Sequence, residues 1–358
     1  MLKFIIFIFF LIFFSACEGD KTHQKPSEKQ TYTPKYYQAT GYAQGTTYNV
    51  IYEDKKGRNL SFSIDSILKD FDQQLSIYVD SSTISQVNKL RIGDSLLVTN
   101  KPLFITCFRL AKSVYQRTNH SFNPALYPLV KYWGFLNFEQ ADIEHQQHEI
   151  DSLLALTDFS DNALKLITHK DKKFVKKYKF CKIDFNAIAQ GFSVDVIANY
   201  LDNLGLKNYM VEVGGELKTK GVNNQNKAWR IGIDKPVEHS KPGEQDFQII
   251  VQINNLALAT SGNYRKFYKK NGVKYAHTIN PTTGKPVQHH LLSTTVVTKD
   301  CGLADAYATA FMVMGVEKTK NFLQENKDLD LAVYLIFSDS TANWQTWQTS
   351  TFDKLIKK

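Results

Sequence analysis

The chain has 358 residues, of which 43% are hydrophobic, with 44 Lys and Arg against 35 Asp and Glu, a formal net charge of +9. The positive charges are spread along the chain and no nucleic-acid-binding module is recognisable, so we expect no nucleic-acid partner. Apart from Cys17 the chain has three widely spaced cysteines without a Cys-x-x-Cys pair, which argues against a disulfide framework or a zinc site.

The N-terminus has the pattern of an export signal. Lys3 precedes an apolar run from Phe4 to Phe14, which is too short to span a bilayer. The small residues before Cys17 are typical of a lipobox, so residues 1–16 are predicted to be a lipoprotein signal peptide and Cys17 the lipidated residue. A plain signal peptide cleaved near Ala16 is the alternative. We expect a lipid anchor in the inner membrane, on its periplasmic side.

The remaining chain divides into a tether and a folded body. Residues 17–35 are polar and without periodicity, which predicts a flexible tether, and residues 36–358 are long enough for one large domain or two fused subdomains. In chain order, the pattern predicts a strand or hairpin over 41–53 and helices over 60–75, 102–119 and, more weakly, 150–156.

A β-α-β unit is predicted in the middle of the chain. Residues 178–185 alternate as a strand, 190–203 form a helix followed by Gly205, and 209–213 form a second strand. Asp184 would then lie at a strand end just before a helix, where carboxylates and helix amides commonly meet phosphate and metal. A simple cap of the helix is the alternative role for Asp184.

Towards the C-terminus, Asn271-Gly272 predicts a type I′ hairpin that pairs Tyr268 with Tyr275 and Lys266 with His277. Residues 330–337 are predicted to form an apolar strand. Because hairpins link most strands and a few helices lie between them, the predicted fold class is α+β. His277 is a candidate for acid–base chemistry, or a structural residue of the hairpin.

The apolar run from Leu303 to Met314 predicts a buried helix that Gly315 ends. Asp305 and Thr309 are four residues apart and therefore share one face of that helix. A carboxylate and a hydroxyl at this spacing are a partial ligand set for a hard cation such as Mg²⁺. Pairing of Asp305 with a lysine, or capping of a neighbouring element, is the alternative.

Five segments in this order and spacing resemble the ApbE family, the FAD:protein FMN transferases: Gly45-Thr46-Thr47-Tyr48, residues 183–195, residues 211–216, residues 260–264 with 277–286, and the segment around Asp305. The resemblance covers roughly residues 40–340. It implies an ApbE-like fold of two fused subdomains, with mixed or antiparallel sheet and packed helices.

The resemblance also implies roles for individual residues. Asp184 and His277 would be catalytic, and Mg²⁺ would be held by the Ala187 carbonyl, Asp305 and Thr309. The FAD-binding residues would be Gln44, Tyr78, Asn123, Pro124, Ala125, Asp184, Gln190 and Ile279. This chain departs from the family pattern at four positions, where Gln44 replaces Met, Asn123 and Asn280 replace Asp, and Gln190 replaces Lys or Glu.

The implied reaction is Mg²⁺-dependent transfer of FMN from FAD to a Thr of an extracytoplasmic redox protein, through a phosphoester bond and with release of AMP. Two alternatives use the same residues differently. The first is a Mg²⁺-dependent FAD pyrophosphatase that gives FMN and AMP. The second is a lipoprotein that binds FAD without catalysing a reaction.

Overall fold

The computed structural model describes residues 35–136, 146–237, 246–263, 267–270, 273–341 and 343–357. The predicted signal peptide, Cys17 and nearly all of the predicted tether lie outside these residues. By its contacts the chain from Pro34 to Lys358 is one compact unit, and every described helix and strand belongs to it. Because this body has its own hydrophobic core, we expect it to fold as an independent unit. Among the described residues, no helix combines the length and hydrophobicity that a bilayer-spanning segment needs.

The helices are α1 (Ser61–Leu75), α2 (Thr83–Lys89), α3 (Pro102–Arg117), α4 (Tyr127–Tyr132), α5 (Gln147–Leu154), α6 (Asn186–Asn203), α7 (Cys301–Glu325) and α8 (Ser350–Asp353), with the short 3₁₀ helices η1 (Pro124–Leu126) and η2 (Lys327–Leu329). The strands are β1 (Tyr36–Ala43), β2 (Thr46–Glu53), β3 (Ser95–Leu97), β4 (Leu164–His169), β5 (Lys172–Lys177), β6 (Tyr209–Val213), β7 (Glu216–Lys220), β8 (Trp229–Asp234), β9 (Phe247–Ile253), β10 (Ala257–Gly262), β11 (Phe267–Lys270), β12 (Val273–Ala276), β13 (Leu291–Thr298), β14 (Ala332–Ser338) and β15 (Trp344–Gln348).

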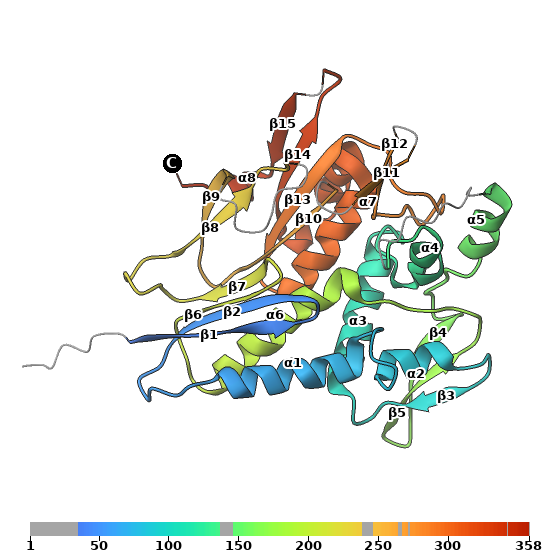
Figure 1. Ribbon diagram of the computed structural model, residues 1–358, viewed down its shortest axis with the longest axis horizontal. Coiled ribbons are helices and arrows are strands. Elements are labelled where there is room, and N and C mark those ends of the chain that lie inside the picture. The colour runs from blue at the N-terminus through green and yellow to red at the C-terminus, as the bar shows by residue number, and fades with distance from the viewer. Residues whose placement is uncertain are drawn as a thin grey trace, which may run out of the picture. The chain divides into compact units, whose positions relative to one another are not determined.

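An eight-stranded sheet in the order β1-β2-β6-β7-β10-β13-β14-β15 organises the body (Figure 1). The strand pairs of this sheet are antiparallel, which agrees with the predicted α+β class. The predicted hairpin over 41–53 is present as β1 and β2. Its turn residues Gln44 and Gly45 have φ of 54° and 73°, the positive values that a type I′ turn requires.

Helices cover one face of this sheet. On the other face, β8, β9 and α8 cover the half of the sheet that contains β7, β10, β13 and β14. On the helical side, Ile64 and Leu68 of α1 pack with Val50 of β2 and Ile197 of α6. This confirms the helix predicted over 60–75 and its buried stripe. On the opposite side, residues of β8 and β9 pack with α8 and with β7, β10, β13 and β14. The sheet is therefore the middle of three layers.

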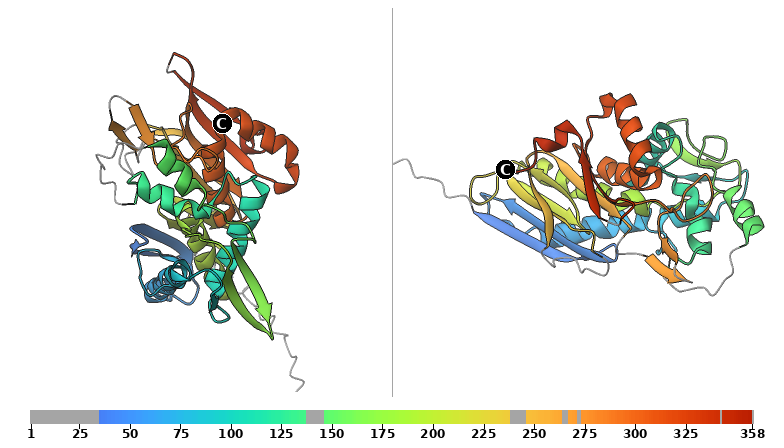
Figure 2. Two further views of the ribbon diagram at one scale, coloured as in Figure 1. Left: turned by 90° about the vertical axis from the view of Figure 1, so that its right-hand side faces the viewer. Right: turned by 90° about the horizontal axis from the view of Figure 1, so that it is seen from above.

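A second, smaller sheet in the order β3-β5-β4 lies apart from the large one. It is at the lower right of Figure 1, and the left view of Figure 2 shows the β4–β5 hairpin extending from the rest of the body. Leu96, Val175 and Leu166 are in register across its strands and pack against the main core.

The strand predicted over 178–185 is wrong, and with it the β-α-β unit. Strand β5 ends at Lys177, and the chain beyond it is held by other groups. The amide and carbonyl of Ile183 bond the side chain of Asn88, each at 2.8 Å, and the Asp184 amide donates to the Pro124 carbonyl at 2.8 Å. These bonds replace a strand ladder, and α6 begins at Asn186, four residues before the predicted start.

Helix α7 is longer than predicted and is interrupted rather than ended at Gly315, whose φ of 75° and ψ of 179° are not helical. The interruption leaves the Met312 carbonyl for the His289 ring, whose Nε2 donates to it at 2.8 Å. Burial lowers the pKa of His289, which keeps the ring neutral in this role. Glycine is required at position 315 because its φ is in the left-handed region.

The hairpin predicted near His277 is present as β11 and β12, and the predicted pairing of Tyr268 with Tyr275 is confirmed. Its tip at 271–272 and Lys266 lie outside the described residues. The Tyr275 ring stacks on Trp133, with the ring centroids 5.9 Å apart. The helices predicted over 102–119 and 150–156 and the strand over 330–337 are found within a few residues of these bounds.

Candidate functional site

A cavity of about 390 Å³ lies between the start of α6, the middle of α7, the end of β10 and the segments around Asn123 and His277. It brings together predicted site residues from distant parts of the chain: Tyr78, Asn123, Pro124, Asp184, Ala187, Gln190, His277, Ile279, Asp305 and Thr309. A concave site with convergent polar groups in apolar walls is the usual form of a small-molecule site.

Helices α6 and α7 cross at Gly191 so closely that no side chain fits there. A Cβ on Gly191 would lie 2.4 Å from the Cys301 carbonyl oxygen and 2.7 Å from the Asp305 Cβ. The Gly191 amide donates to Asp305 Oδ2 at 3.1 Å. In a regular α-helix the same amide faces the carbonyl of the residue four positions earlier, which is Ala187. The Asp305 carboxylate therefore meets α6 one turn after Ala187, and both residues line the cavity.

Asp305 is 6% exposed, and within the described part of the chain the Gly191 amide is its hydrogen-bond donor. Burial raises the pKa of this carboxyl group to about 7, against the lowering effect of that amide. The alternative prediction for Asp305 was an ion pair with a lysine. Among the described residues, Asp305 forms no such ion pair. Thr309 lies one turn later, and its Oγ1 is 3.3 Å from the Ser261 hydroxyl.

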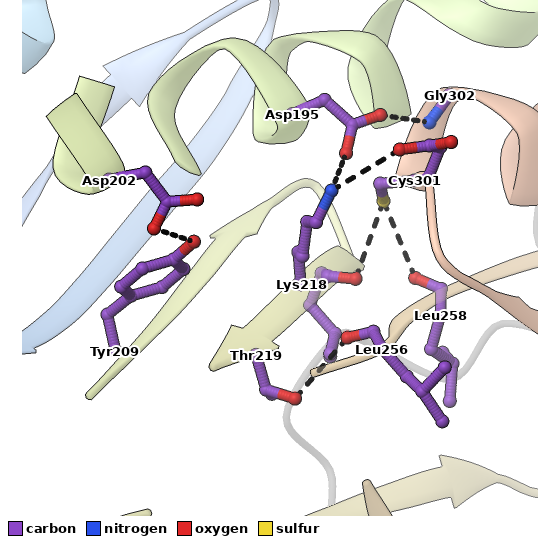
Figure 3. A network of polar contacts seen from close by, with 11 residues as sticks. Asp195, Asp202, Tyr209, Lys218, Thr219, Leu256, Leu258, Cys301 and Gly302 are labelled. Carbon is purple, nitrogen blue, oxygen red and sulfur yellow. Dashed lines mark hydrogen bonds and ion pairs between the residues drawn. The ribbon is translucent and has the colours of Figure 1, made fainter. Parts of the chain in front are cut away.

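The N-terminus of α7 is fixed by a carboxylate from α6, as Figure 3 shows. Asp195 Oδ2 accepts from the Gly302 amide at 2.9 Å, and Asp195 Oδ1 lies 2.8 Å from Lys218 Nζ on β7. The same Nζ is 3.5 Å from Asp300. Helices α6 and α7 and strand β7 are thus tied together one turn before Asp305. The carboxylate also complements the positive end of the α7 dipole.

Asp184 contacts the first turn of α6 but is not its N-cap, which is Phe185. It lines the cavity, and its Oδ1 accepts from the Asn186 amide in the first turn of α6 at 2.8 Å. Burial raises the pKa of its carboxyl group to about 6, against the lowering effect of that amide. Its own amide is held by the Pro124 carbonyl, so the 123–125 segment positions it.

Asn123 uses its side chain to shape this wall. Its Oδ1 accepts from the Ala125 amide at 2.8 Å and its Nδ2 donates to the Thr157 carbonyl at 2.9 Å. Tyr78, by contrast, is 67% exposed at the cavity and is therefore not a residue of the hydrophobic core. Its ring is free to meet a ligand there.

His277 is half-buried and lines the cavity directly after β12. The next residues hold the loop in place: Thr278 donates to Asn263 Oδ1 at 2.9 Å, and Ile279 is 3% exposed. Asn280 Oδ1 accepts from the Thr282 amide at 2.8 Å, which makes an Asx-type turn.

Two predicted ligand-binding residues are not part of the cavity wall. Ala125 is fully buried in the main core, and Gln44 lies in the β1–β2 turn, with the N and O atoms of its side-chain amide buried and without a hydrogen-bond partner among the described residues. Conversely, Glu216, which was not among the predicted site residues, is buried and lines the cavity. The apolar wall was missed because its residues have no chemical signature in the sequence: Phe122, Leu126, Tyr127, Val130, Phe135, Leu136, Met312 and Val313.

An antiparallel α+β body whose cavity is lined by buried carboxylates and a hydroxyl has the form of a small-molecule-binding protein. The chain belongs to the ApbE family, whose model matches residues 44–335.

Named relatives agree with this over nearly the whole chain. The FAD:protein FMN transferase of Vibrio cholerae is 31% identical over 352 residues, 97% of each chain, and that of Escherichia coli K12 is 28% identical over 356 residues, 96% of this chain and 95% of the relative. Among solved structures, the flavin transferase ApbE of Vibrio cholerae matches with a TM-score of 0.76 at 30% identity, covering 90% of this chain and 99% of that one. The apo flavinyl transferase ApbE of Pseudomonas stutzeri matches with a TM-score of 0.78 at 29% identity, covering 91% and 98%.

Proposed function

We propose that this protein is a FAD:protein FMN transferase. The observation that carries the proposal is the convergence of Asp184, Ala187, Asp305 and Thr309 on one cavity at the α6–α7 crossing, in a chain whose full-length relatives bear that name. In the reaction, the hydroxyl oxygen of an acceptor Thr forms a bond to the FMN-side phosphorus of FAD. The bond from that phosphorus to the bridging oxygen breaks, and AMP leaves with that oxygen.

The residues fit a Mg²⁺ ion. The Ala187 carbonyl, the Asp305 carboxylate and the Thr309 hydroxyl are hard oxygen donors, and all three residues line the same cavity. The raised pKa of Asp305 marks a carboxylate that lacks a compensating cation. When bound, Mg²⁺ would neutralise pyrophosphate charge and stabilise the charge that develops on the phosphoryl oxygens.

Two residues of the cavity wall are our candidates for handling the proton of the acceptor hydroxyl. Asp184 has a pKa of about 6, so at neutral pH it is mostly ionised and can accept a proton, close to the value that suits a general base. His277 lies on the same cavity and is the second candidate. The exposed Tyr78 ring supplies a flat surface on which a flavin or adenine ring can stack.

The N-terminal pattern supports an exported, lipid-anchored protein. Cys17 after a short apolar run would carry the lipid, in the inner membrane with the body on the periplasmic side. The acceptor would then be an extracytoplasmic redox protein with a Thr that receives FMN.

The test uses residues 34–358, FAD, Mg²⁺ and a periplasmic flavin-subunit fragment with an acceptor Thr. AMP release and the intact mass of the fragment are followed together. We expect a mass gain equal to FMN minus water, lost in Asp305→Ala and in Thr309→Ala. Asn321→Ala, an exposed change on the second segment of α7, is the matched control.

Two results would replace the proposal. AMP release without labelling of the fragment would make the protein a FAD pyrophosphatase. FAD binding that tolerates Asp305→Ala, with no AMP under any condition, would leave a binding protein without chemistry.

A further inference from the structure

The small sheet β3-β5-β4 carries a second apolar row, in which Leu97 is exposed and Phe174 and Ile167 are half-buried. Leu97, Phe174 and Ile167 are paired across its strands, one position along from the row that packs on the core. Because neighbouring side chains on a strand point to opposite faces, this second row lies on the outer face. Its three residues belong to none of the hydrophobic clusters among the described residues, and Leu97 is 51% exposed.

Positive side chains flank this apolar row on both sides. By the same alternation, Lys176 and Lys165 are paired on one side of it, and Lys172 is the positive side chain on the other, opposite His169. No carboxylate occupies an outer-face position in these three strands. The one ion pair that these three lysines form with described residues is Lys165 with Asp161, at 4.0 Å and at the edge of the sheet. The face therefore carries an excess of positive charge around an apolar centre.

Aromatic residues continue the face beyond β5. Tyr178 and Phe180 are each 43% exposed, and Lys176 Nζ lies 5.3 Å from the centroid of the Tyr178 ring. Lysines with apolar stems beside exposed aromatic rings are typical of protein surfaces at a lipid–water boundary, where the stems and rings enter the headgroup region and the charges stay in water.

We propose that this outer face, defined by Leu97, Phe174, Ile167, Lys165, Lys172, Lys176 and Tyr178, docks on an anionic lipid surface. Charge complementarity favours headgroups of negative charge, and the attraction falls off within about 10 Å at ordinary salt. The exposed face of a three-stranded sheet is an extended surface, and so is the surface of a bilayer. The inference does not depend on the transferase activity.

The face would give the body a fixed side towards the bilayer. Tyr178 and Phe180 are followed within a few residues by Asp184 of the cavity. Docking of this face would therefore also set the orientation of the cavity relative to the membrane.

The test measures co-sedimentation of residues 34–358, without FAD, with vesicles of phosphatidylcholine alone or mixed with phosphatidylglycerol. We expect binding to the anionic vesicles only, weakening as salt is raised. Lys172→Glu/Lys176→Glu should weaken it roughly tenfold or more, and Leu97→Ser should weaken it at constant charge. Lys318→Glu/Lys327→Glu, at exposed positions on α7 and η2, changes the net charge equally and should leave binding nearly unchanged.

Absence of binding to anionic vesicles would overturn the proposal. The proposal would also be overturned if Lys172→Glu/Lys176→Glu and Lys318→Glu/Lys327→Glu weakened vesicle binding equally. The net charge of the protein, rather than this face, would then cause the binding. Equal binding to phosphatidylcholine alone would remove the electrostatic part and refute the choice of ligand. Binding of polyglutamate, lost in Lys172→Glu/Lys176→Glu and without vesicle binding, would assign the face to an acidic protein partner instead. Circular dichroism of each variant checks that the fold is kept.

Discussion

Replacement of Gly191 by alanine tests whether the α6–α7 crossing builds the site. The new Cβ would lie 2.4 Å from the backbone carbonyl oxygen of Cys301, about 1 Å inside ordinary van der Waals contact. A rotamer change cannot relieve a clash between Cβ and a backbone atom, so the two helices must separate. Separation would move Asp305 away from Ala187 and stretch the 3.1 Å hydrogen bond from the Gly191 amide.

The size of the effect follows from two opposing terms. Overpacking of a tight interface costs about 1–3 kcal/mol, and a clash with backbone belongs near the upper end. Alanine regains about 1 kcal/mol over glycine through its helix propensity. A net loss of about 2 kcal/mol remains, which corresponds to a fall in Tm of roughly 4 °C for a protein of this size. A misplacement of about 1 Å in a catalytic constellation can cost on the order of 100-fold in rate.

The assays are thermal unfolding of residues 34–358 and the Mg²⁺ concentration that half-saturates AMP release. We expect Gly191→Ala to lower Tm and to raise that concentration. Asn199→Ala is the matched control, because it adds helix propensity at an exposed position of the same helix. An unchanged or higher Tm for Gly191→Ala, with the Mg²⁺ dependence of the natural protein, would refute the reasoning.

Three further predictions concern buried or paired groups. Asp195→Ala should lower the free energy of unfolding in urea by about 3 kcal/mol. The reason is that Lys218, which is mostly buried, and the Gly302 amide of α7 both lose the Asp195 carboxylate. A loss as small as that of an exposed Asp→Ala change would contradict this. Arg58 holds the pKa of Asp54 at about 2, below its unfolded value, so this pair contributes stability above about pH 4 that is lost as pH falls towards about 2. Asp54→Asn should flatten that part of the stability profile, and equal acid slopes would argue against it. Burial raises the pKa of the thiols of Cys107, Cys181 and Cys301, that of Cys181 to about 11. These thiols should therefore resist alkylation at pH 8 until urea unfolds the body. Rapid labelling of the native protein would contradict this prediction.

Local patterns in the sequence were sufficient for the elements whose forces are local. The spacing of Ile64, Leu68 and Phe71 predicted α1, and the β11–β12 register followed from the two residues at its tip. Asp305 and Thr309 were placed on one face by helical periodicity alone, and both line the cavity. The resemblance of five motifs then pointed to the family.

The tertiary structure decided what depends on partners distant in the sequence. Residues 178–185 have the alternation of a strand, yet the Asn88 side chain takes the backbone bonds of Ile183, so no ladder forms. The apolar cavity wall and the burial of Glu216 also depend on elements that only folding brings together.

The clearest case is Gly191, which in the sequence is one glycine in a helix. Its importance comes from the approach of α7 to within contact of its Cα, and no local pattern encodes that approach. Sequence periodicity fixes the direction of each side chain on its own element. The distances between elements are set by packing, and in this protein packing brings the Asp305 carboxylate of α7 to the Gly191 amide of α6.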